Sequence, residues 1–267
     1  MKRVRLDDEL ISQGICDNRA DALRTLMAGL VSSGGKRLTS PGLKVRPGIE
    51  LHVKGRIPYV GRGGLKLAGA LDHFNVDPSG LSCVDVGCST GGFTDCLLKR
   101  GASHVISVDV GRAQFDWSLR QDERVVLLER TNMVDLPSLG YESCCDLAVC
   151  DVSFTSIATV LPSVLSVLTP FGRFLTLVKP QFEAPSHLVG EGGVVRDPSV
   201  HQDVLAWAIR LFADSGLYPV DVCASPITGA KGNKEFFLLG DRSLFARADD
   251  LDLANQVDML VRKTVEL

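Results

Sequence analysis

A lysine at the end of an apolar run is the first residue in this sequence whose position suggests chemistry. Residues 174–178 form the run, Gly172 precedes it, and Pro180 follows Lys179 directly. A short apolar run bounded in this way predicts a buried strand. Because an ammonium group is costly to bury, Lys179 either extends its stem along the surface to reach water or has a task at the strand end. Lys179 alone favours the first interpretation, so other residues must decide.

A glycine-rich loop, "DVGCSTGGF" at residues 85–93, follows another predicted strand and opens a helix. Glycines in such a loop let the backbone approach a ligand closely, but many dinucleotide-binding folds share this turn. NAD would present a pyrophosphate anion to the helix amides. Asp85, directly before the loop, is instead suited to meet a positive charge. This favours S-adenosylmethionine, whose amino group and sulfonium are cationic, as the ligand.

Polar side chains follow the next predicted strands. Asp109 ends the second strand, where a carboxylate can hold the hydroxyls of a ribose; the alternative is a cap for the helix after it. Asn132 follows the third strand and would lie by the adenine, and Asp151 follows the fourth. The predicted cofactor-binding residues are Asp85, Gly87, Ser89, Thr90, Gly91, Gly92, Phe93, Asp109, Gln114, Asn132 and Asp151.

Alternating strands and helices must position these residues. Strands are predicted over residues 82–87, 104–111, 124–130, 145–154 and 172–180, helices over 91–101, 113–120, 157–168 and 200–217, and two final strands within 218–240. This alternation is typical of a Rossmann-like α/β fold, a doubly wound and mostly parallel sheet. We expect seven strands, with a terminal hairpin that adds an antiparallel strand.

The first part of the chain carries a different charge. The formal net charge of the 267 residues is −3, but up to Lys66 there are 13 Lys+Arg and 6 Asp+Glu, a balance of +7, which leaves −10 for the remainder. A small basic unit on an acidic body suggests that the small unit meets a polyanion; a solvated basic face without a partner is the alternative.

We predict a small α+β unit over residues 1–55, a linker over 56–64 and the α/β body over 65–267. In the small unit, a helix over residues 6–13 and a second helix capped by Asp17 or Asn18 precede short strands. This pattern resembles an S4-type RNA-binding domain. The predicted RNA-binding cations are Arg3, Arg5, Arg19, Lys36, Arg37 and Arg62.

Several classes of protein are disfavoured by composition. The eight cysteines form no C-x-x-C pair and have no histidines at zinc-ligand spacing, so we expect reduced thiols and no metal. No signal peptide is recognised at the N-terminus, and the apolar runs fall short of the roughly 20 residues that span a bilayer. We therefore expect a cytoplasmic protein.

Essentially the whole chain resembles the TlyA family, often labelled hemolysin A, whose members join an S4 domain to an FtsJ-like ribose 2'-O-methyltransferase. The resemblance rests on "GRGGLKLAGAL", "DVGCSTGGFTD", "SVDVG", "ERTN", "CDVSFTS", "LVKPQFE", "GVVRD" and "GAKGNKEFF". It implies S-adenosylmethionine-dependent methylation of ribosomal RNA or a ribosomal subunit, at a cytidine. It also implies a catalytic tetrad that falls on Lys66, Asp151, Lys179 and Glu235, and it places Tyr59 where other members have tryptophan.

The implied tetrad gives Lys179 a task. A ribose hydroxyl is a poor nucleophile, and a neutral lysine amine could accept its proton as it attacks a methyl group. Lys66 would then steady the developing alkoxide, while Asp151 and Glu235 orient the lysines and the ribose. The choice of Lys179 over Lys66 as the base comes from the resemblance. Without it, a surface ion pair would be the commoner state of residues such as Lys66 and Glu235.

Two other functions stay open at this point. A membrane-lytic hemolysin is disfavoured by the absence of a spanning run, and an S4-type RNA-binding protein with an inactive methyltransferase body is disfavoured by the intact tetrad. The sequence leaves the methylated nucleotide, the ribosomal subunit and the oligomeric state undetermined.

Overall fold

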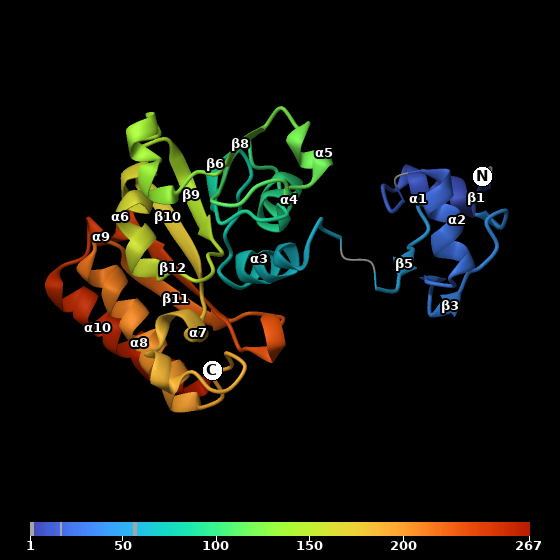
Figure 1. Ribbon diagram of the computed structural model, residues 1–267. Coiled ribbons are helices and arrows are strands. Elements are labelled where there is room, and N and C mark those ends of the chain that lie inside the picture. The colour runs from blue at the N-terminus through green and yellow to red at the C-terminus, as the bar shows by residue number, and fades with distance from the viewer. Residues whose placement is uncertain (1–2, 17, 56–57) are drawn as a thin grey trace. The chain divides into compact units, whose positions relative to one another are not determined.

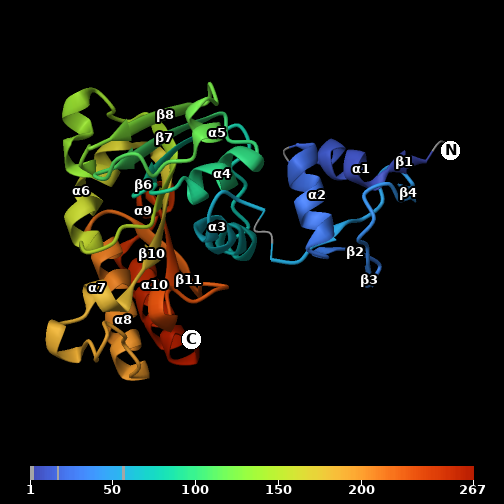
Figure 2. The ribbon, with the colours of Figure 1, turned by 45° about the vertical axis from the view of Figure 1, so that its right-hand side comes forward.

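The computed structural model describes residues 3–16, 18–55 and 58–267. The chain divides into two compact units, Met1–Ile57 and Pro58–Leu267; most of their elements are labelled in Figure 1, and Figure 2 shows them from a second direction.

The N-terminal unit combines two helices with short strands. Its elements are β1 (Val4–Arg5), α1 (Leu6–Ser12), α2 (Arg19–Met27), β2 (Val31–Ser33), β3 (Lys36–Arg37), β4 (Lys44–Val45) and β5 (His52–Val53). β1 pairs with β4, and β2 lies between β3 and β5, all antiparallel. Leu6, Leu10 and Leu26 are fully buried in the core of this unit. Helix α1 ends at Ser12, one residue before the predicted end at residue 13.

The start of α2 is set by a side-chain cap. Asn18 Oδ1 accepts a hydrogen bond of 3.0 Å from the backbone N–H of Asp21, which satisfies a donor that the first helical turn leaves free. Asn18 is therefore the cap. The alternative, Asp17, lies outside the described residues.

The C-terminal unit is built on a seven-stranded sheet of order β11-β12-β10-β9-β6-β7-β8. The strands are β6 (Ser82–Val86), β7 (His104–Asp109), β8 (Val125–Glu129), β9 (Cys145–Cys150), β10 (Leu168–Val178), β11 (Tyr218–Ala224) and β12 (Phe236–Asp241). β8, β7, β6, β9 and β10 are parallel to one another, whereas β12 runs antiparallel to both β10 and β11. The Rossmann-like prediction, including the terminal antiparallel hairpin, is confirmed.

Helices cover both faces of this sheet, which explains why its strands are apolar almost throughout. The helices are α3 (Arg62–His73), α4 (Gly92–Lys99), α5 (Trp117–Arg120), α6 (Ile157–Val167), α7 (Pro180–Glu183), α8 (Pro198–Asp214), α9 (Arg242–Phe245) and α10 (Asp250–Lys263). One core cluster joins the sheet to α6, α8 and α10, and the other joins it to α3, α4 and α5. Successive strand residues alternate between them: Cys83 belongs to the second cluster and Val84 to the first.

The structure differs from the sequence-based predictions at several elements. The helix predicted over residues 113–120 is only the single turn α5, because Ala113 has φ +60° and Asp116 caps the helix at Ser118 N. Helices α3, α7, α9 and α10 were not predicted, and β10 begins at Leu168 rather than at residue 172. Helix α3 begins at Arg62, inside the predicted linker.

The rest of the predicted linker that is described also packs on the C-terminal unit. Val60 N donates to Asp95 Oδ2 at 3.0 Å, and Lys99 Nζ lies 5.4 Å from the centre of the Tyr59 ring. Residues 58–64 are therefore part of the second unit, anchored on α4. Residues 56 and 57 of the predicted linker lie outside the described residues.

Two kinds of feature are absent from the described residues. None of their helices is both long and apolar enough to cross a membrane. Within the same residues, no group of three or more His, Cys, Asp or Glu side chains is placed to hold a metal ion.

Candidate active site

Two cavities adjoin at the edge of the sheet where the parallel strands end. The first, here the charged cavity, has a volume of about 400 Å³, and the second, here the loop cavity, about 640 Å³. Residues from the loops after β6 and β9 line both: Gly87, Ser89, Asp151, Ser153 and Phe154. A ligand in one cavity would therefore share a wall with a ligand in the other.

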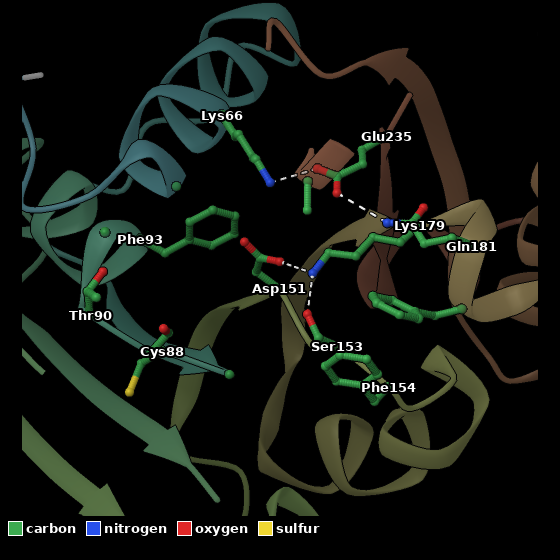
Figure 3. A pocket seen from close by; sticks show the side chains of 16 residues that line it. Lys66, Cys88, Thr90, Phe93, Asp151, Ser153, Phe154, Lys179, Gln181 and Glu235 are labelled. Carbon is green, nitrogen blue, oxygen red and sulfur yellow. Dashed lines mark hydrogen bonds and ion pairs between the residues drawn. The ribbon is translucent and has the colours of Figure 1, made fainter. Parts of the chain in front are cut away.

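Strand direction brings distant residues into the charged cavity. Asp151 follows β9 and Lys179 follows β10, so both lie at the carboxyl edge of the sheet. Glu235 precedes β12, which runs antiparallel and therefore begins at that edge; Val178 is paired with Phe236. Lys66 comes from α3, on one face of the sheet (Figure 3). Four separate segments thus supply the four residues of the implied tetrad.

The four side chains form two ion pairs (Figure 3). Lys66 Nζ lies 2.6 Å from Glu235 Oε2, and Lys179 Nζ lies 2.5 Å from Asp151 Oδ1. The side chains of Lys179 and Glu235 are 7% and 3% exposed. Burying a charge is costly unless it is paired, so each pair offsets much of the desolvation of its partners. The surface ion pair considered for Lys66 and Glu235 is therefore wrong: Glu235 is buried, and the side chain of Lys66 is only 12% exposed.

Lys179 does not keep its ammonium in water by extending along the surface. Its Nζ also donates to Ser153 Oγ at 2.9 Å and lies 5.7 Å from the centre of the Phe182 ring. The amine is thus held by a carboxylate, a hydroxyl and an aromatic face. Lys179 is directed toward the cavity, where its position suits chemistry.

Gln181 is a further polar residue of the charged cavity. Its Nε2 lies 3.5 Å from Glu235 Oε1, at the limit of a hydrogen bond. Its Oε1 is buried without a hydrogen-bond partner among the described residues. An acceptor left free beside the Lys66–Glu235 pair could receive a hydrogen bond from a bound ligand.

The loop cavity presents acceptor groups on loops. Asp109 accepts hydrogen bonds from Ser89 N at 2.7 Å and from Gly111 N at 2.6 Å, one on each carboxylate oxygen. Gln114 and Asn132 line the same cavity. Asn132 Oδ1 also caps a short 3₁₀ turn by accepting from Val134 N at 3.3 Å. Asp109, Gln114 and Asn132, predicted from three separate segments, thus lie around one cavity.

Asp85 is not in either cavity. It is fully buried beneath the glycine loop, and its Oδ2 accepts from the backbone N and the hydroxyl of Thr94, at 2.9 and 2.7 Å. Burial raises the pKa of Asp85 to about 7, with smaller contributions in the same direction from Asp151 and Asp109. The position of Asp85 does not support the prediction that it meets the cationic ligand directly. Asp85 instead anchors the first turn of α4.

The glycine loop itself divides between the cavities. Thr90, Gly92 and Phe93, predicted around the cofactor, line the charged cavity but not the loop cavity. Gly91 lines neither; it is the N-cap of α4, with φ +94°. Gly87 and Ser89 line both cavities, so the loop forms part of the wall that the cavities share.

Sequence reasoning missed several residues that line the charged cavity. They are Gly63, Cys88, Ser153, Phe154, Gln181, Phe182 and Ala230. Most are one to three residues from a predicted tetrad or loop residue, in "DVSF" and "KPQFE". Proximity to those motifs was the available signal, but residue type alone did not distinguish them from surface residues.

The predicted RNA-binding cations have different surroundings. Arg5 and Arg19 both reach the buried carboxylate of Asp7, at 2.8 and 3.2 Å. Arg37 donates to the backbone oxygens of Gly29 and Ala28. In the second unit, Arg62 donates to Thr228 O at 3.0 Å. Arg3 and Lys36 are exposed.

Comparisons with known proteins agree with this architecture. The model of the FtsJ-like methyltransferase family matches residues 59–242. The 16S/23S rRNA (cytidine-2'-O)-methyltransferase TlyA of Mycobacterium tuberculosis is 41% identical over 92% of this chain and 94% of its own. A solved Streptococcus thermophilus protein named as a hemolysin is 37% identical, with a TM-score of 0.69, over 100% of this chain and 97% of that one.

A more distant likeness bears on the fold alone. An S-adenosylmethionine-dependent methyltransferase from Mesorhizobium loti is 20% identical, with a TM-score of 0.50, over 68% of this chain and 100% of that chain. The family match and the similarity to these relatives cover both the sheet and the segments that carry the tetrad residues. The chain belongs to the TlyA family of FtsJ-like methyltransferases.

Proposed function

We propose that this protein transfers a methyl group from S-adenosylmethionine to a ribose 2'-hydroxyl of ribosomal RNA, at a cytidine, in the cytoplasm. The observation that carries the proposal is the pair of buried Lys–carboxylate contacts in a cavity that shares a wall with the loop cavity. The name of the TlyA relative, a 16S/23S rRNA (cytidine-2'-O)-methyltransferase, supports the choice of substrate.

The loop cavity fits S-adenosylmethionine by the chemistry of its donors and acceptors. Each carboxylate oxygen of Asp109 accepts one backbone hydrogen bond and retains capacity for another, which suits the two hydroxyls of a ribose. Asn132 would hold the adenine, and the wall formed by Gly87 and Ser89 would face the methionine part. When bound, S-adenosylmethionine supplies an electrophilic methyl group.

The residues of the charged cavity would activate and orient the acceptor. We assign the base to Lys179, because its partners Asp151 and Ser153 line both cavities, whereas Glu235, the partner of Lys66, lines the charged cavity alone. In its neutral form, the Lys179 amine would take the hydroxyl proton. Lys66, fixed by Glu235, would stabilise the negative charge that develops on the oxygen.

Mapping of ribosomal RNA tests the proposal. The purified protein, S-adenosylmethionine and ribosomal subunits from cells lacking this protein should give a ribose-methylated cytidine that mass spectrometry locates. Glu235→Gln should methylate much more slowly. An unmodified RNA would contradict the proposal, and release of dye from liposomes by the same preparation would then favour the lytic alternative.

We further propose that residues 1–55 are an S4-type RNA-binding domain. Its exposed cations, among them Arg3 and Lys36, support this. Removing a cation that binds one RNA phosphate should reduce the magnitude of the salt slope of RNA binding by about 0.7 to 0.9. Lys36→Ala should show this reduction, whereas Lys263→Ala in the other unit, whose ammonium pairs with Asp221 at 2.5 Å, should not. Equal slopes for the two variants would count against the assignment.

A further inference from the structure

We propose that Ser153 is a positioning residue that directs the Lys179 amine at the acceptor hydroxyl. This inference rests on the proposed role of Lys179 as the base. The Lys179 Nζ has two polar partners among the described residues, Asp151 Oδ1 at 2.5 Å and Ser153 Oγ at 2.9 Å (Figure 3). Ser153 lies at the wall shared by the charged cavity and the loop cavity.

The argument depends on the tetrahedral shape of the amine. A neutral lysine amine carries two N–H bonds and one lone pair. If the ion-pair contact with Asp151 orients one N–H and the hydrogen bond to Ser153 orients the other, rotation about the terminal C–N bond is fixed and the lone pair takes the remaining direction. On transfer, the proton leaves the hydroxyl oxygen and joins this lone pair. The resulting ammonium keeps both the ion pair and the hydrogen bond, so no partner has to move.

Asp151 alone would not fix this direction. With a single acceptor, the amine could rotate about that one hydrogen bond and present either an N–H or the lone pair to the substrate. The Phe182 ring, 5.7 Å from Nζ, restrains the stem of the lysine but accepts no strong hydrogen bond. The second acceptor is therefore what selects one orientation, and proximity with alignment is a large part of catalysis in such sites.

A nearby serine provides a matched control. Ser156 lies three residues further along and loses the same hydroxyl in Ser156→Ala. Its Oγ donates to Glu183 at 2.6 Å and caps α6, and it lines neither cavity. Ser156→Ala should therefore lower the melting temperature without changing the rate of methyl transfer.

Single-turnover methylation of the ribosomal subunit by the full chain, at saturating S-adenosylmethionine, tests the proposal. Ser153→Ala should lower the rate about 10-fold, while the dissociation constants for RNA and S-adenosylmethionine change less than about twofold. Ser153→Thr, which restores the hydroxyl, should recover most of the rate. Full activity in Ser153→Ala, or a loss confined to binding, would overturn the proposal.

A double-mutant cycle then shows whether Ser153 acts through Lys179. In a Lys179→Ala background, Ser153→Ala should cause no further loss. An equal loss in both backgrounds would mean that Ser153 contacts the RNA independently, and the proposal would be wrong. Wild-type protein that leaves the RNA unmodified would refute the proposed function, whereas an active wild type with a fully active Ser153→Ala would refute only this inference.

Discussion

The two cavities are built by different means, although they share a wall. The charged cavity takes side chains from segments far apart in the sequence and holds them as buried ion pairs; Lys66 and Glu235 are 169 residues apart. The loop cavity takes its groups from the loops after successive strands and holds Asp109 with backbone amides. The charged cavity is suited to stabilise charge that changes during a reaction. The loop cavity is suited to bind a ligand that is the same in every turnover. Substitutions should therefore separate rate from affinity.

The largest expected effect is at Lys179. Lys179→Ala should lower the single-turnover methylation rate by about 10²-fold or more, the usual contribution of a positioned base. Lys179→Arg should fail almost as badly, because a guanidinium does not release its proton at workable pH. Calorimetry should give nearly unchanged affinity for S-adenosylmethionine in both variants. An arginine variant that keeps most of the rate would show that Lys179 acts through its charge alone. The contrast between the two cavities would then be weaker.

The counterpart in the loop cavity is Asp109. Asp109→Ala should weaken S-adenosylmethionine binding by roughly 1.5–3 kcal/mol, since it removes charge-assisted hydrogen bonds. The methylation rate at saturating cofactor should stay close to that of the wild type. Asp109→Asn, which keeps one acceptor oxygen, is the control and should lose less. Unchanged affinity in the alanine variant would remove Asp109 from the binding site.

A smaller effect is expected at Gly229, which lies against the carboxylate of Glu235 in the Lys66–Glu235 ion pair. A Cβ added there would lie 2.0 Å from Glu235 Oε1, so Gly229→Ala must displace Glu235 from Lys66. We expect a rate about 10-fold lower, with cofactor affinity retained. Gly42→Ala, whose Cβ would make only ordinary contacts with Arg5, is the control. A Gly229→Ala variant with the wild-type rate would show that the Lys66–Glu235 pair need not be held this closely.

The smallest effect on methyl transfer is expected at Asp85, which is buried beneath the glycine loop. Because burial raises its pKa to about 7, Asp85 stabilises the fold fully below its unfolded pKa near 4, and this contribution is lost as the pH rises through 7. Asp85→Asn should lack this dependence. Chemical denaturation should find the variant more stable relative to wild type at pH 8 than at pH 4, by several kcal/mol, since each unit of pKa shift corresponds to about 1.4 kcal/mol.

Asp197 gives a control of opposite sign. It caps α8, and hydrogen bonds from Ser199 lower its pKa, so its contribution is present above its unfolded pKa and is lost as the pH falls through the folded value. Asp197→Asn should therefore be less stable than wild type at pH 8, with the difference shrinking toward acid pH. If Asp85→Asn followed the same course, Asp85 would be ionised in the folded protein throughout.

Local pattern determined much of this protein. Apolar runs that end in Asp109, Asp151 and Lys179 predict strands of a parallel sheet, and the rule that such strands end at one edge gathers these residues. The glycine loop and the final hairpin were also recognisable, because each depends on residues adjacent in the sequence. The four residues of the implied tetrad could also be named from the sequence, but through the resemblance of their motifs to those of the family.

Only the tertiary structure decided how those residues are paired and which face they occupy. The pairing of Lys66 with Glu235 depends on the register of β12 against β10 and on the position of α3, neither of which is encoded near either residue. The burial of Asp85 depends on Thr94 folding back over it at the start of α4. A residue's type and its neighbours in sequence limit what it can do, but desolvation and direction come from segments packed against it in space.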